Sequence, residues 1–169
     1  MAENTNSKNN AVNLDLSETA RTKVWVNGDC TKILELNLTD LGIMGRAKDA
    51  EEKLDELQAE ANRLASAEVP SVIKTKEDEE KLNNAIELFR EIDRKMRELV
   101  NGIFDFNVCD VCCDGGSMYD PIGGKYRYEY IIEKLMNLYG QSWQRENKRN
   151  QDRLKSYTAK YTKKRTVKK

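Results

Sequence analysis

The sequence predicts a mainly α-helical protein (α+β) with a small N-terminal β-hairpin, an antiparallel hairpin of two long helices and a C-terminal helix. Two runs of apolar residues, spaced alternately three and four apart, predict the long helices, and a third apolar stripe predicts the last one. An Asn-Gly pair between two β-branched segments predicts the strands. With 169 residues, of which 38% are hydrophobic and 34% charged, the chain can form one domain with a modest core.

The β-hairpin is predicted from two short segments, 23–26 and 31–36, whose residues favour extended structure. Asn27-Gly28 between them accepts the positive φ angles of a type I′ turn. A lone hairpin is marginally stable in water, so this one must pack on a helix or pair with another strand. A further short strand is predicted at 12–16.

The first long helix is predicted to begin at an N-cap in Thr39-Asp40 and to end near Ser66, before Pro70. The second begins at Thr75, which forms a capping box with Asp78. The first seam consists of Ala47, Ala50, Leu54, Leu57, Ala61 and Leu64, and the second of Leu82, Ala85, Phe89, Ile92, Met96, Leu99 and Ile103.

These two seams have equal length and a short connector, which predicts an antiparallel hairpin with arms of roughly 35–40 Å. An alternative use of such seams is to bind a partner helix, but the presence of both in one chain favours an internal core.

A third helix is predicted from about Tyr126, after an irregular segment with two Gly-Gly pairs. Its core-facing stripe consists of Tyr128, Ile131, Ile132, Leu135, Leu138, Tyr139 and Trp143. The predicted organisation has five segments: a disordered or weakly structured N-terminus (1–20), the two hairpins (21–104), a Gly/Cys-rich loop (105–125), the C-terminal helix (126–157) and a basic tail (158–169).

The net charge of zero conceals a strong polarity along the chain. Residues 145–169 contain eleven basic and two acidic residues, a charge of +9, so the remaining 144 residues carry −9. Such a tail suits an acidic surface, either a nucleic acid or the body of another copy. The alternative is a solvated helix end that continues into a disordered tail.

The absence of histidine excludes Ser-His-Asp triads, Cys-His pairs and His-containing metal sites. The four cysteines, Cys30, Cys109, Cys112 and Cys113, lack the two separated knuckles of a typical four-cysteine zinc site, so we interpret them as reduced, small apolar side chains. The Gly-rich segment does not match a phosphate loop or a calcium loop. We therefore expect no enzyme activity, no metal and no cofactor.

The basic C-terminal region is the remaining candidate site. Aromatic residues alternate there with cations, a composition that suits bases and phosphates or an acidic protein partner. The candidate partner-binding residues are Trp143, Tyr157, Tyr161, Lys160, Lys163 and Lys164. No segment predicts a membrane helix or a secretory signal, so we expect a soluble, cytoplasmic protein.

The order of motifs resembles that of small tail assembly chaperones from phages with long, non-contractile tails. "VNGDCTKILELNLTDLGIMGRAKDAEEKLDEL" (26–57) is similar to the family's hairpin and first helix, and Phe104-Asp105, Gly115-Gly116 and "RNQDRLKSYTAKYTKK" (149–164) follow in the family's order. The likeness spans about residues 22–163. The chain departs from the family where a Phe-Gly pair usually follows the second helix, because the cysteine cluster stands there.

The resemblance implies a protein of the host cytoplasm that binds the tape-measure protein, a very long helical chain, and keeps it soluble until tail-tube subunits polymerise around it. It carries no functional residue over to this chain. It also allows self-association and a longer, frameshifted form. The alternatives are a structural virion or scaffold component and a nucleic-acid-binding accessory protein that acts through 145–169.

Overall fold

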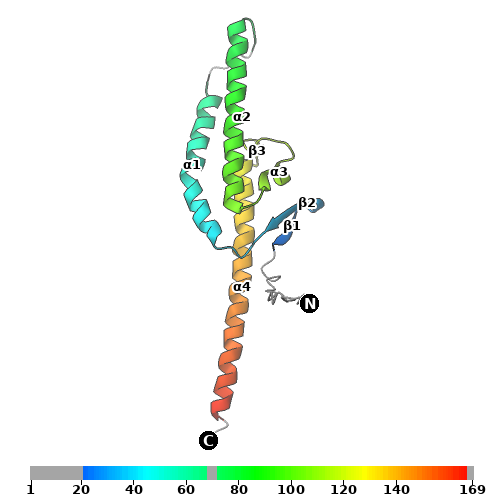
Figure 1. Cartoon of the computed structure of the whole chain (residues 1–169), viewed down its shortest axis with the longest axis vertical. Coiled ribbons are helices and arrows are strands. Elements are labelled where there is room, and N and C mark those ends of the chain that lie inside the picture. Colours follow the sequence, from blue (N-terminus) through cyan, green and yellow to red (C-terminus); the bar gives the residue numbers. More distant parts are fainter. Residues whose placement is uncertain (1–20, 68–71, 167–169) are drawn as a thin grey trace, which may run out of the picture.

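The computed structural model describes residues 21–67 and 72–166, with side chains described as far as residue 159. It confirms the predicted class, mainly α with a small β-hairpin, in an elongated molecule (Figure 1). The strand predicted at 12–16 and the segment 1–20 lie outside the described residues. In chain order the elements are β1 (Thr22–Val26), β2 (Asp29–Leu36), α1 (Gly42–Ala65), α2 (Lys76–Phe104), α3 (Val108–Cys113), β3 (Pro121–Ile122), β4 (Lys125–Tyr126) and α4 (Arg127–Thr166).

The β1–β2 hairpin forms as predicted. Asn27 and Gly28 have φ angles of 55° and 75°, which the turn requires and which glycine and asparagine accept readily. The strands are antiparallel, and β2 points Leu34 and Leu36 into the core. Lys32 on β2 forms an ion pair of 2.5 Å with Asp114. The hairpin is therefore held on the helices by apolar burial and by this pair.

Helix α1 begins later than the predicted cap at Thr39-Asp40. Its N-cap is Leu41, which makes no side-chain capping bond. Asp40 instead accepts a hydrogen bond from the Gly42 N–H at 2.8 Å and pairs with Arg46 at 2.7 Å, so its carboxylate closes the preceding turn rather than capping the helix. The Arg46 Nε also donates to the carbonyl of Ile103, which fixes the start of α1 beside the end of α2.

Helix α2 begins with the predicted capping box. Thr75 Oγ1 accepts from the Asp78 N–H at 3.1 Å, and Asp78 Oδ2 accepts from the Thr75 N–H at 2.9 Å. With 24 residues, α1 has the predicted arm length of roughly 35–40 Å, whereas α2, with 29 residues, is longer at roughly 44 Å. Figure 1 shows α2 beginning well beyond the end of α1. The first turns of α2 therefore have no α1 beside them.

The segment predicted to be an irregular loop, 105–125, contains three short elements. Asn107 accepts a hydrogen bond from the Asp110 N–H and starts the single-turn helix α3, and β3 and β4 pair across Gly123-Gly124. Asp105 and Asp114, both with positive φ, end α2 and α3. This segment turns the chain back so that α4 starts beside the middle of α2 (Figure 1).

Helix α4 has 40 residues and a length of roughly 60 Å. It starts at Arg127, one residue after the predicted start, and continues without a break past residue 157, where the helix was predicted to end. Its first half packs against the other helices, and its second half projects away from them (Figure 1). The boundary expected between helix and tail thus falls inside one helix.

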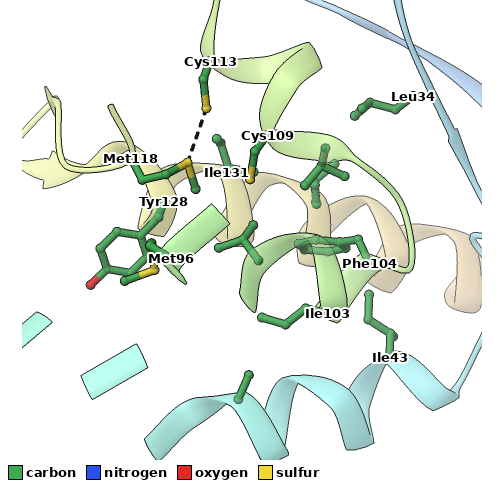
Figure 2. Close-up of a cluster of buried hydrophobic side chains, with 14 of the residues drawn as sticks. Leu34, Ile43, Met96, Ile103, Phe104, Cys109, Cys113, Met118, Tyr128 and Ile131 are labelled. Atoms are coloured by element: carbon green, nitrogen blue, oxygen red, sulfur yellow. Dashed lines mark hydrogen bonds between the residues drawn. The ribbon is translucent and has the colours of Figure 1, made fainter. Parts of the chain in front are cut away.

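The core lies where the lower half of α2 meets α1, α3, β2 and the first half of α4 (Figure 2). Ile92, Met96 and Val100 of α2 are fully buried, and the ring of Phe104 lies 6.2 Å from that of Tyr139 on α4. Among the described residues, no charged side chain is buried in this core. Apolar burial is therefore its main source of stability. None of the described helices contains a run long and apolar enough to cross a membrane.

Candidate partner-binding surfaces

The cysteines of α3 contribute to the core. Cys109 and Cys113 are buried as predicted, and Figure 2 shows Cys113 Sγ beside Met118 Sδ, at 3.4 Å. Cys112 is half-buried, and Cys30 is exposed on β2. Within residues 21–67 and 72–159, no three Cys, Asp or Glu side chains are placed to share a metal ion. Cys109 and Cys113 therefore pack as small apolar side chains, whereas Cys30 does not.

Cys112 and Cys113 of α3 differ in the pKa of their thiols. A hydrogen bond with Cys109, together with the charges of Arg97 and Arg127, outweighs burial and lowers the pKa of Cys113 to about 7. Burial raises the pKa of Cys112 to about 11. Cys113 is only 1% exposed, so a dissolved reagent or substrate does not reach its thiol in this fold.

A half-buried network around Asp93 joins α2 to the loop that precedes α4. Asp93 Oδ2 pairs with Arg97 Nε at 2.8 Å, while its Oδ1 accepts from Ser117 Oγ at 2.7 Å and from the Met118 N–H at 2.6 Å. Arg97 also donates to the carbonyl of Gly116. Burial opposes ionisation of Asp93, but these hydrogen bonds outweigh it, so the pKa of Asp93 lies below its ordinary value. The ionised carboxylate therefore holds the loop on α2.

Arg127, the first residue of α4, completes this junction. Its guanidinium donates to the carbonyl of Cys113 at 2.7 Å and to Asp120 Oδ2 at 2.8 Å. Gly116 lies directly against this pair, and a Cβ there would meet Asp120 Oδ2 at 2.6 Å. The junction thus fixes where α4 starts relative to α3 and the loop.

Between α1 and the first half of α4 lies an open groove of about 810 Å³, which we call the α1/α4 groove. Its length along α1, from Met44 to Gln58, corresponds to roughly 21 Å, or four turns of a helix. At one end the Tyr128 hydroxyl donates to Gln58 Oε1 at 2.8 Å. The apolar side chains that line the groove are Met44, Ala47, Leu54, Tyr128, Ile132 and Met136.

Charged side chains form both rims of the α1/α4 groove. Lys48 and Glu51 pair on the α1 rim at 3.1 Å, and Lys125 and Glu133 pair on the α4 rim. The remaining rim charges, Asp55 and Glu129, are both acidic. An apolar floor between charged rims has the chemistry that accepts an amphipathic helix, and the flexible side chains of two methionines let such a groove adapt to different sequences.

A second exposed apolar surface lies at the start of α2. We call residues 72–89 the α2 tip; they include five acidic and three basic residues. Ile86 and Phe89 belong to or adjoin the predicted seam of α2 but are 40% and 37% exposed. The Phe89 ring also contacts that of Tyr119 at 5.9 Å. The other exposed apolar residues of the tip are Val72, Ile73 and Leu88.

The third surface is the projecting half of α4. We call residues 144–166 the α4 arm; they include nine basic and two acidic residues. Leu154 and Tyr157, three positions apart, are exposed on it. Trp143 marks its base, where the indole packs edge-on against Tyr139 at 6.2 Å. The arm therefore combines strong positive charge with a short apolar stripe.

The structure separates the residues predicted for partner binding. Trp143 is half-buried against the core, and its buried Nε1 has no hydrogen-bond partner among the described residues. Tyr157 is exposed roughly 21 Å further along α4. The backbone of the other four lies in α4, but their side chains fall outside the described ones: Lys160, Tyr161, Lys163 and Lys164.

Sequence reasoning missed the groove and the α2 tip. The groove forms between helices about 80 residues apart, so no local pattern marks it. For the tip, a sequence signal existed in Val72, Ile73, Ile86 and Leu88, which are apolar residues outside the predicted seam. Comparison of the chain with protein-family models, curated proteins and solved structures found no match.

Proposed function

We propose that this chain is a phage tail assembly chaperone that binds a long helical partner, the tape-measure protein, and keeps it soluble during assembly. The observation that carries the proposal is the α1/α4 groove, an open apolar channel four helical turns long with charged rims. The order of motifs along residues 22–163 resembles that of this chaperone family, and this resemblance indicates the tape-measure protein as the partner. Shielding of a partner's apolar surface requires no catalytic group.

The groove suits reversible shielding of a partner's apolar stripe. Its floor offers apolar area without a deep pocket, so a helix can bind along its length and leave again when another protein competes for the same stripe. Lys48 and Lys125 are already paired with rim glutamates, which leaves Asp55 and Glu129 to favour a helix with basic flanks. Binding through such a surface selects for amphipathic character more than for a particular sequence.

The test is co-expression with a candidate tape-measure protein. We expect the wild-type chain to increase the soluble fraction of that protein severalfold. Met44→Glu places a charge in the groove and should remove most of this effect, because Met44 is 53% exposed and the change leaves the core intact.

Leu41→Glu is the matched control, since Leu41 is also exposed and does not line the groove. It should protect the partner as the wild type does. Unchanged partner solubility with the wild-type chain would refute the chaperone proposal. Finding the chain in purified, finished particles would favour the structural alternative.

A further inference from the structure

The α2 tip and the α4 arm lie at opposite ends of the long molecule (Figure 1). Each exposes apolar residues three positions apart, Ile86 and Phe89 on the tip and Leu154 and Tyr157 on the arm. On a helix this spacing places two side chains one turn apart on the same side, roughly 4.5 Å along the axis. The two stripes therefore have matching periodicity.

The charges of the two ends are also complementary. The α2 tip has two more acidic than basic residues, and the α4 arm has seven more basic than acidic residues. Among the described side chains, Glu79, Glu80 and Glu87 of the tip take part in no ion pair. On the arm, the described cations outside any ion pair are Arg145, Lys148, Arg153 and Lys155.

The arm of a given copy cannot reach its own tip. Helix α4 is continuous from its packed first half to Thr166, so the arm points away from α2 along the axis of the molecule (Figure 1). Any contact between an arm and a tip must therefore join two copies.

We propose that the α4 arm of one copy docks on the α2 tip of a second copy. The contact packs the Leu154/Tyr157 stripe against the Ile86/Phe89 stripe, with arm cations beside tip carboxylates. A docked pair still has one free tip and one free arm, so the interaction is heterologous and adds copies head to tail. This inference does not depend on the identity of any other partner, because it uses neither the groove nor the tape-measure protein.

The first experiment is analytical ultracentrifugation of the purified, nuclease-treated full-length chain over a range of concentrations. In low salt the average mass should rise with concentration above the 19.5 kDa of one copy, and it should fall back as salt screens the opposed charges. A chain that stays monomeric at several hundred micromolar in low salt would overturn the proposal.

Two variants then test the surfaces separately. Ile86→Ser on the tip and Leu154→Ser on the arm should each weaken association by roughly tenfold or more, since each removes an exposed apolar side chain from the contact. Leu41→Ser is the matched control, because Leu41 is exposed outside both surfaces, and it should associate as the wild type does.

Mixing the two variants distinguishes head-to-tail docking from other modes. The Ile86→Ser chain keeps an intact arm and the Leu154→Ser chain keeps an intact tip, so an equimolar mixture should form a 1:1 dimer and nothing larger. Association of the wild type without such a dimer would point to arm–arm or tip–tip pairing and overturn the proposal. A wild-type chain that binds random DNA through its arm at moderate salt, and that stays monomeric when DNA is absent, would also overturn the proposal.

Discussion

The two longest helices each have a covered half and an uncovered half, and the uncovered halves differ in origin. In α2 the apolar seam continues with the same spacing from Leu82 to Ile103, yet its buried residues all lie in the lower part, and Phe89 above them is 37% exposed. In α4 the seam itself ends at Trp143, and the helix continues without apolar support from the rest of the molecule. The exposed part of the α2 seam therefore indicates a surface on which another molecule can pack. The second half of α4 has no such seam, so only interactions within the helix stabilise it.

The largest expected effect comes from replacing isoleucine by alanine at a buried and at an exposed position of α2. Ile92→Ala removes a fully buried side chain and should lower the free energy of unfolding by about 2–4 kcal/mol. Ile86→Ala, six residues earlier on the same helix, should lower it by less than about 1 kcal/mol, because Ile86 is largely uncovered. Urea denaturation of both variants measures the difference. Equal losses would mean that the α2 tip is covered in solution.

The junction that positions α4 is tested at Gly116. Gly116→Ala should lower the free energy of unfolding by about 1–3 kcal/mol, because the new Cβ would push apart the Asp120–Arg127 pair. Gly140→Ala is the matched control, since no atom within 4 Å opposes a Cβ there. It should instead stabilise α4 by about 0.5–1 kcal/mol. Thermal unfolding followed by circular dichroism distinguishes a loss from a gain.

The same junction predicts a pH dependence. The pKa of Asp93 is lowered in the folded state, so its contribution to stability is complete above the ordinary carboxyl pKa of 3.8 and is lost as the pH falls below that value. Asp93→Asn should cost about 1–2 kcal/mol near neutral pH, because Arg97 then lacks its charged partner. The difference between wild type and variant should shrink as the pH falls below about 4. Urea midpoints measured from about pH 7 to pH 3 follow it, and a constant difference would contradict this role for the charge.

Local rules predicted a turn and one helix start correctly, although the N-cap predicted at Thr39-Asp40 was wrong. The Asn27-Gly28 turn and the Thr75 capping box depend on backbone preferences of a few neighbouring residues, and both form as predicted. The prediction that 105–125 is irregular was wrong because Asn107 can cap a single turn that only burial of Cys109 and Cys113 makes stable. That burial depends on β2 and α2, far away in the chain.

The candidate surfaces could be predicted only in part. The basic charge of the α4 arm is visible in composition, but the position of Trp143 in the packed half and of Tyr157 in the projecting half depends on where the neighbouring helices end. Asp93 and Arg97 have the spacing of an ordinary exposed pair on a helix, and only the loop carrying Ser117 and Met118 makes them half-buried. The α1/α4 groove in turn depends on that loop.

The smallest expected effect is that of a substitution on the α4 arm, set against the same substitution in the packed half of α4. Leu135→Ala in the packed half should lower the free energy of unfolding by about 2–3 kcal/mol, whereas Leu154→Ala on the arm should change it by less than about 0.5 kcal/mol, because Leu154 is 61% exposed and contributes little to the core.

Amide hydrogen exchange measures the same contrast without mutation. In dilute protein, amides between Trp143 and residue 159 should exchange orders of magnitude faster than those between Tyr128 and Tyr139, since the arm can fray without exposing core surface. Raising the protein concentration should slow exchange on the arm and on the α2 tip together if these two surfaces dock between copies. Protection of the arm alone would indicate that it pairs with another arm, and protection of neither would leave the arm a solvated helix.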